Sequence, residues 1–112
     1  PDQWVANRHI QNLYILEASG DCLASRGIVY GSLVLCERTP REPRDGEIVV
    51  VRIGDEHTMK VWRRQGTRLW LEDGEGTTIA EFSWPLDVRA EGVEVIGIAL
   101  YAWRPLGGNG GT

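Results

Sequence analysis

Apolar residues in this 112-residue sequence recur with a period of two and are interrupted every few positions by turn-forming residues. Because successive side chains of a strand point to opposite faces, such alternation is typical of half-buried β-strands. Gly, Asp, Ser and Pro lie between the apolar runs, as turns require. The pattern predicts a mostly antiparallel β domain with about six to eight short strands, and it favours a helical turn only at residues 22–26. The expected strands lie at residues 13–16, 33–36, 48–53, 58–62, 69–71 and 93–103.

The middle of the chain predicts a three-stranded meander. Turns at residues 54–55 and 65–66 separate runs that are close enough to pair as hairpins. This pairing puts Lys60 in the middle of a strand, and strict alternation places Thr58, Lys60 and Trp62 on one face.

Length and composition indicate one compact domain. Hydrophobic residues make up 42% of the chain and charged residues 25%, as in ordinary globular proteins. We expect residues 1–106 to form the domain and the Gly-rich residues 107–112 to form a flexible tail. The net charge of -4 and the lack of a cluster of Lys and Arg argue against direct DNA binding by this segment.

The sequence predicts neither membrane association nor a cofactor. No apolar stretch approaches the roughly 18 residues that cross a bilayer, and the first residues lack the layout of a secretion signal, so we expect a cytoplasmic protein. Cys22 and Cys36 are the only cysteines, with no CxxC pair and no histidine at a ligand spacing. This argues against a zinc site and against a disulfide scaffold.

Cys22 and Lys60 are the residues best suited to chemistry. Lys60 is the one lysine among twelve basic residues, and an amine can lose its proton when desolvated, whereas a guanidinium effectively does not. Cys22 follows a tight turn and begins the expected helical turn, a place that favours the thiolate. A cysteine taken alone is more often a small buried residue, so the combination with Lys60 is what favours a chemical role.

Several motifs occur in a characteristic order along residues 13–105. They are Ser19-Gly20-Asp21-Cys22-Leu23, Arg26-Gly27-Ile28, Gly46-Glu47-Ile48-Val49-Val50, Gly54-Asp55-Glu56 and Thr58-Met59-Lys60. In these motifs the chain resembles the C-terminal domains of the LexA repressors, the UmuD mutagenesis proteins and the lambda-type phage repressors. Those domains are Ser-Lys self-cleaving peptidases related in fold to signal peptidases.

The resemblance implies a folded β-sheet domain with short helical turns and with Cys22 and Lys60 at the catalytic positions. Backbone N–H groups around Cys22 would stabilise the oxyanion. It also implies a homodimer, for which the strand at residues 93–103, with Ile98, Leu100 and Trp103 exposed, is the expected edge. In such repressors an N-terminal helix-turn-helix outside this sequence binds operator DNA. A RecA filament then stimulates self-cleavage during the SOS response to DNA damage.

Three departures from the family pattern leave alternatives open. Cys22 replaces the nucleophilic serine, Ser32 stands where an acidic residue is usual, and no small-residue/Gly cleavage bond precedes the motif. The domain is therefore either a self-processing enzyme or a dimerisation and sensing module that retains the fold. Its parent protein is either a repressor or a UmuD-like mutagenesis protein. The thiol is either natural or a substitution that traps an uncleaved form.

Overall fold

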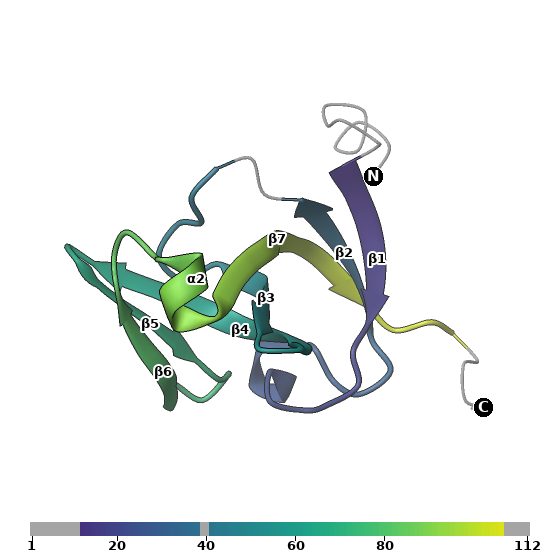
Figure 1. The fold of residues 1–112 in the computed structure, drawn as a ribbon. Helices are drawn as coiled ribbons and strands as arrows, with labels where there is room; N and C mark the ends of the chain where they lie inside the picture. The colour runs from purple at the N-terminus through teal and green to yellow at the C-terminus, as the bar shows by residue number, and fades with distance from the viewer. Residues whose placement is uncertain (1–11, 39–40, 107–112) are drawn as a thin grey trace.

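A single seven-stranded antiparallel sheet forms the part of the chain that the structure describes, residues 12–38 and 41–106 (Figure 1). This computed structural model confirms the predicted mostly β fold, and the predicted tail at residues 107–112 lies outside the described residues. The strand order is β1-β2-β7-β3-β4-β5-β6. The strands are β1 (Leu13–Glu17), β2 (Leu33–Arg38), β3 (Ile48–Ile53), β4 (Glu56–Gln65), β5 (Arg68–Glu72), β6 (Thr78–Ser83) and β7 (Val93–Trp103).

The predicted meander is present as β3, β4 and β5, and the expected helical turn is the 3-10 helix η2 (Ala24–Arg26). Two elements were not predicted, β6 and the short helix α2 (Val88–Glu91). Asp87 caps α2 by accepting a hydrogen bond from the Ala90 N–H, and Gly92 ends it with a positive φ. An Asp and a Gly in these places are ordinary start and stop signals for a helix.

The long strand β7 joins two halves of the sheet. Its residues 93–98 pair with β3, whereas residues 97–103 pair with β2. Register shifts interrupt both ladders, and β7 curves between the β1–β2 pair and the remaining strands in Figure 1. Such irregularities bend a sheet, so one continuous sheet encloses two apolar clusters.

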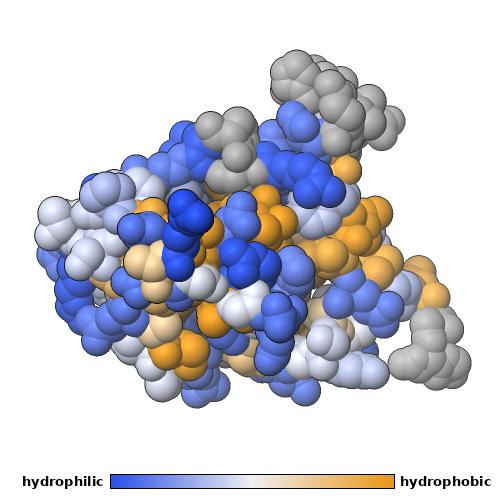
Figure 2. Space-filling model, viewed as in Figure 1, coloured by the Kyte–Doolittle hydropathy of each residue, from blue (hydrophilic) through white to orange (hydrophobic). Residues whose placement is uncertain are grey.

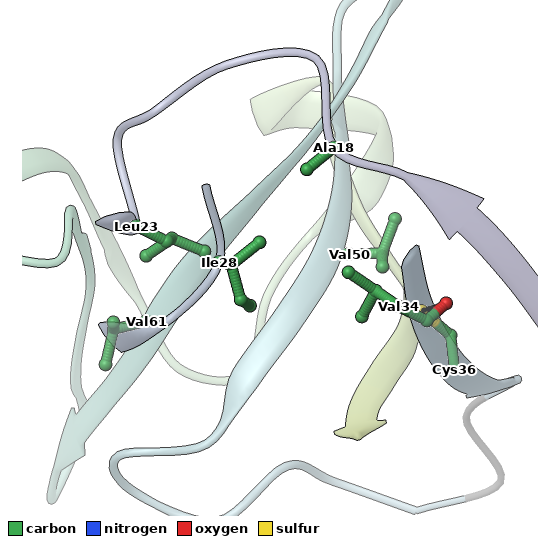
Figure 3. Packing of buried hydrophobic residues seen from close by; sticks show 7 residues of the cluster. All are labelled: Ala18, Leu23, Ile28, Val34, Cys36, Val50 and Val61. Atoms are coloured by element: carbon green, nitrogen blue, oxygen red, sulfur yellow. Dashed lines mark hydrogen bonds between the residues drawn. The ribbon is translucent and has the colours of Figure 1, made fainter. Parts of the chain in front are cut away.

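The first core cluster lies beneath the turn that carries Cys22. Its buried members are Ala18, Leu23, Ile28, Val34, Cys36, Val50 and Val61. Figure 3 shows the Leu23 side chain directed toward Ile28, and Val50 beside Val34. Leu23 is only 2% exposed, so its burial anchors the turn immediately after Cys22.

The second core cluster explains the uninterrupted apolar run of β3. Its buried members are Val49, Val51, Trp62, Leu69, Leu71 and Ile98. Val49 and Val51 enter this cluster while Val50 enters the first, so both faces of β3 are covered.

The expected exposure of Ile98 is wrong, and Leu100 and Trp103 are only half-buried rather than exposed. Its side chain is 2% exposed and belongs to the second cluster, because β7 lies inside the sheet and Ile98 pairs with Val49. Tyr101, 56% exposed, is instead the large apolar side chain that β7 presents to solvent.

Candidate active site

Backbone hydrogen bonds hold Cys22 in a short connection between β1 and η2. The Asp21 carboxylate accepts a 2.7 Å hydrogen bond from the Tyr30 N–H, and the Asp21 carbonyl accepts one from the Ala24 N–H. The Gly74 N–H donates to the Cys22 carbonyl at 2.8 Å. Hydrogen bonds therefore connect the turn both to Tyr30, in the segment before β2, and to Gly74, in the β5–β6 connection.

Gly74 is required where these two segments meet. A Cβ atom on this residue would lie 2.7 Å from Ser25 Oγ and 3.1 Å from the Cys22 carbonyl oxygen. A side chain would therefore displace the turn that carries the thiol.

The structure brings the two predicted site residues together. Lys60 comes from the middle of β4, where it pairs with Val49 of β3. Its Nζ atom lies 3.2 Å from Cys22 Sγ, and that sulfur also lies 3.7 Å from the Met59 carbonyl oxygen. An amine at this distance can exchange a proton with the thiol.

The two cysteines occupy opposite environments. Cys22 is exposed, so the alternative of a small buried residue does not hold for it. Cys36 is fully buried, and burial raises the pKa of its thiol from 9.0 to about 11. Its Sγ donates to the Val34 carbonyl at 3.7 Å. Cys22 is therefore the accessible thiol of the pair.

A cleft of about 290 Å³ opens beside Cys22. Its walls come from the end of β1, the turn before Cys22, and the start of β4. Apolar side chains, including Leu16, Ile28 and Met59, line it together with polar residues such as Ser19 and Thr58. This size and lining suit a peptide side chain next to the thiol.

His57 and Ser32 have roles that the sequence only partly indicated. His57 is exposed near the start of β4, and it also lines the cleft. No local pattern predicted this, because the opposite wall comes from β1. Ser32 is fully buried, and its Oγ accepts a hydrogen bond from the Val29 N–H at 3.1 Å, which indicates a structural turn residue.

Two further findings concern residues 12–38 and 41–106. Within these ranges no group of three or more His, Cys, Asp or Glu side chains is placed to hold a metal ion. No helix there has the length and apolar character needed to cross a membrane.

The chain matches a known family and several curated proteins. Residues 1–99 match the family described as Peptidase S24-like. LexA repressor 1 of Pseudomonas putida is 46% identical over 63 residues, which are 56% of this chain and 31% of the repressor. The LexA repressor of Pseudomonas chlororaphis is 39% identical over 84 residues, 73% of this chain and 41% of the repressor. The chain thus spans less than half the length of these curated relatives.

Proposed function

Because this chain belongs to the Peptidase S24-like family, we propose that it is the self-cleavage and dimerisation domain of a LexA-like transcriptional repressor. The observation that carries the proposal is the 3.2 Å separation of Lys60 Nζ and Cys22 Sγ beside a cleft. Cys22 is the proposed nucleophile and Lys60 its general base and acid.

The proposed reaction begins with transfer of the thiol proton from Cys22 Sγ to Lys60 Nζ. The sulfur then attacks the carbonyl carbon of the scissile peptide bond, and backbone N–H groups around Cys22 stabilise the oxyanion. Lys60 returns the proton to the leaving amine as the C–N bond breaks. Water finally hydrolyses the thioester, which frees the new carboxyl group and restores the thiol.

A thiol changes what the lysine must do. A serine hydroxyl needs a strong base, whereas a cysteine already forms some thiolate near neutral pH. Once Lys60 has taken the thiol proton, it holds that proton next to the leaving amine. The pair is therefore suited both to deprotonation of the thiol and to protonation of the leaving amine.

The proposed substrate is a segment of the protein's own longer chain. Gly20 is the only glycine before Cys22 in this sequence, and it is part of the nucleophile motif itself. We therefore place the cleaved bond upstream of residue 1. The apolar cleft next to Cys22 would receive the side chains that flank this bond.

The proposed homodimer uses the last part of β7. Residues 99–103 pair with β2 on one side, and among the described residues no strand occupies the other side. Tyr101 and Ile15 are each 56% exposed, and Figure 2 shows apolar surface gathered toward the end of the molecule where β1 and the end of β7 lie. Antiparallel pairing of two β7 edges would bury this surface and satisfy the open backbone groups.

Two further partners, operator DNA and a RecA filament, are proposed from the family and from the name LexA repressor that the relatives carry. We propose that operator DNA is bound by a separate N-terminal helix-turn-helix, since this chain has a net charge of -4. A RecA filament would stimulate cleavage and end repression in the cytoplasm during the SOS response.

A non-cleaving dimerisation or sensing module on the same fold, or a UmuD-like mutagenesis protein, is the alternative. What favours the non-cleaving module is the replacement of the serine by Cys22.

One experiment separates the self-cleaving domain from the non-cleaving module. The full-length protein is incubated at alkaline pH, and its fragments are identified by mass spectrometry, for the wild type and for Cys22→Ala, Lys60→Ala and Cys36→Ala. We expect one specific cleavage in the wild type and in Cys36→Ala, and its loss in the other two variants. If no fragment depends on Lys60, the domain is a non-cleaving module.

A further inference from the structure

The Cys22–Lys60 pair has a chemical capacity that a serine–lysine pair lacks. A hydroxyl group is inert toward peroxides, whereas an accessible thiolate is oxidised by them to a sulfenic acid. Cys22 is exposed beside an open cleft, so a small oxidant can reach its sulfur. The amine of Lys60, 3.2 Å away, is then the nucleophile already in contact with the oxidised sulfur.

We propose that Cys22 and Lys60 form a reversible oxidation site, in which hydrogen peroxide drives a covalent bond between Cys22 Sγ and Lys60 Nζ. This inference goes beyond the proposed function, because the bond requires only the observed juxtaposition and no cleavage activity.

The chemistry balances in two steps. The Cys22 thiolate attacks one oxygen of hydrogen peroxide, the O–O bond breaks, and the products are a sulfenic acid and hydroxide. Lys60, which holds the proton taken from the thiol, gives it to this hydroxide to form water and becomes a neutral amine. The amine then attacks the sulfur, the S–O bond breaks, and the departing hydroxide takes a proton from nitrogen as the second water. In sum, a thiol, an amine and one peroxide molecule give a sulfenamide and two water molecules.

The local structure favours closure of this bond. Hydrogen bonds from Gly74 to the Cys22 carbonyl and from Tyr30 to Asp21 hold the turn, so the thiol stays in place. Lys60 reaches it through a flexible four-carbon stem, and only the end of that stem has to move.

Disulfide formation within the chain does not compete. Cys36, the second of the two cysteines, is fully buried in the first core cluster and donates to the Val34 carbonyl. A sulfenic acid at Cys22 is therefore in contact with the Lys60 amine, whereas the Cys36 thiol is not accessible to it.

The bond would remove both members of the proposed dyad at once. With sulfur and nitrogen joined, neither a nucleophile nor a base is left, and a thiol reductant would restore both. This consequence for cleavage rests on the proposed function, whereas the bond itself does not.

The test treats the intact protein with hydrogen peroxide and measures its mass and its peptides without reduction. We expect a loss of two hydrogen atoms and one joined peptide that contains Cys22 and Lys60, both reversed by dithiothreitol. Cys36→Ala should behave as the wild type. Lys60→Arg, which keeps the positive charge but lacks a nucleophilic amine, should accumulate oxygen on Cys22 with no joined peptide.

Oxygen addition at Cys22 of the wild type without a joined peptide, or no change at Cys22, would overturn the proposal. A disulfide between two chains through Cys22 would also overturn it. Because these readouts are masses and not cleavage products, a protein that fails to cleave itself can still form the bond. The two proposals therefore fail separately.

Discussion

Lys60 Nζ donates a 3.2 Å hydrogen bond to Cys22 Sγ, although β4 carries the lysine and the turn after β1 carries the cysteine. The amine is half-buried and the thiol is exposed. An exposed thiol in contact with an amine has a reactivity that is measurable without any cleavage.

Alkylation should discriminate strongly between the two cysteines. Iodoacetamide at neutral pH is expected to label Cys22 at least about tenfold faster than Cys36, because Cys36 is fully buried and burial raises its pKa to about 11. Lys60→Gln should change the labelling rate of Cys22, because it removes the amine that donates to the sulfur. Peptide mapping over time gives both rates, and equal labelling of the two thiols would contradict the assigned environments.

Gly74→Ala should disturb the thiol from a distance. The added methyl group would lie 2.7 Å from Ser25 Oγ and 3.1 Å from the Cys22 carbonyl, so we expect a loss of about 1–3 kcal/mol in unfolding free energy. The alkylation rate of Cys22 should change in the same variant. Gly20→Ala is the matched control for stability, since a Cβ atom at Gly20 meets nothing within 4 Å. Equal urea midpoints for the two variants would refute the close approach.

Local patterns were sufficient to predict most strands, whereas the pairing of Cys22 with Lys60 was predicted from the ordered motifs that resemble the family. Apolar alternation is a local property, and it located the meander that contains Lys60. The exposure of Ile98 was mispredicted because the place of β7 between β2 and β3 depends on pairing between distant segments. The cleft escaped prediction for the same reason, since β1 and β4 form its walls. Most residues of strand β6 are exposed, and the strand carries a weak apolar signal.

Stability should fall on the alkaline side because of Cys36 and Tyr14. Burial raises the pKa of the Cys36 thiol from 9.0 to about 11 and that of the Tyr14 hydroxyl from 10.0 to about 12. The folded state therefore retains protons that the unfolded chain releases, so stability is full below pH 9 and is lost as the pH rises toward 11 and 12.

As the pH rises from 9 to above 11, titration of Cys36 alone should lower the free energy of unfolding by about 2–3 kcal/mol, since each pKa unit is worth about 1.4 kcal/mol. Urea unfolding at a series of pH values measures the slope. Cys36→Ala should be less stable at neutral pH, because it leaves a small cavity, but its alkaline slope should be shallower than that of the wild type. An unchanged slope would show that the thiol is not the group that titrates.

Stability should also fall in acid through Glu47. Its carboxylate accepts two hydrogen bonds from Arg41, at 2.9 and 3.0 Å, and one from the Arg44 N–H. The bonds from Arg41, and then that from Arg44, lower the pKa of Glu47 below its ordinary 4.5. The folded state thus binds fewer protons than the unfolded chain, so this stabilisation is present above pH 4.5 and is lost as the pH falls through the lowered pKa.

Glu47→Gln should cost about 1 kcal/mol at neutral pH and progressively less in acid. Glu75→Gln, at an exposed turn position, is the control and should leave the acid limb unchanged. The measurement is the urea midpoint against pH, and a constant difference between the wild type and Glu47→Gln would contradict the role of the carboxylate.

The proposed dimer makes the exposed side of β7 the decisive surface. Tyr101 lies in the part of β7 that is paired with β2 alone among the described strands, and its ring contacts Trp103 with centroids 5.9 Å apart. A carboxylate at this position would enter the paired interface of both protomers and lose its hydration there. We therefore expect Tyr101→Glu to weaken dimerisation at least about tenfold without a comparable loss of folding stability.

Ile79→Glu is the matched control, because Ile79 is 49% exposed on β6, at the opposite edge of the sheet from β1. Sedimentation equilibrium of both variants and the wild type gives the association constants. If Ile79→Glu weakens the dimer and Tyr101→Glu leaves it unchanged, the interface lies at β6 and not at β7. In that case the open half of β7 would need another partner, such as a segment of the longer chain.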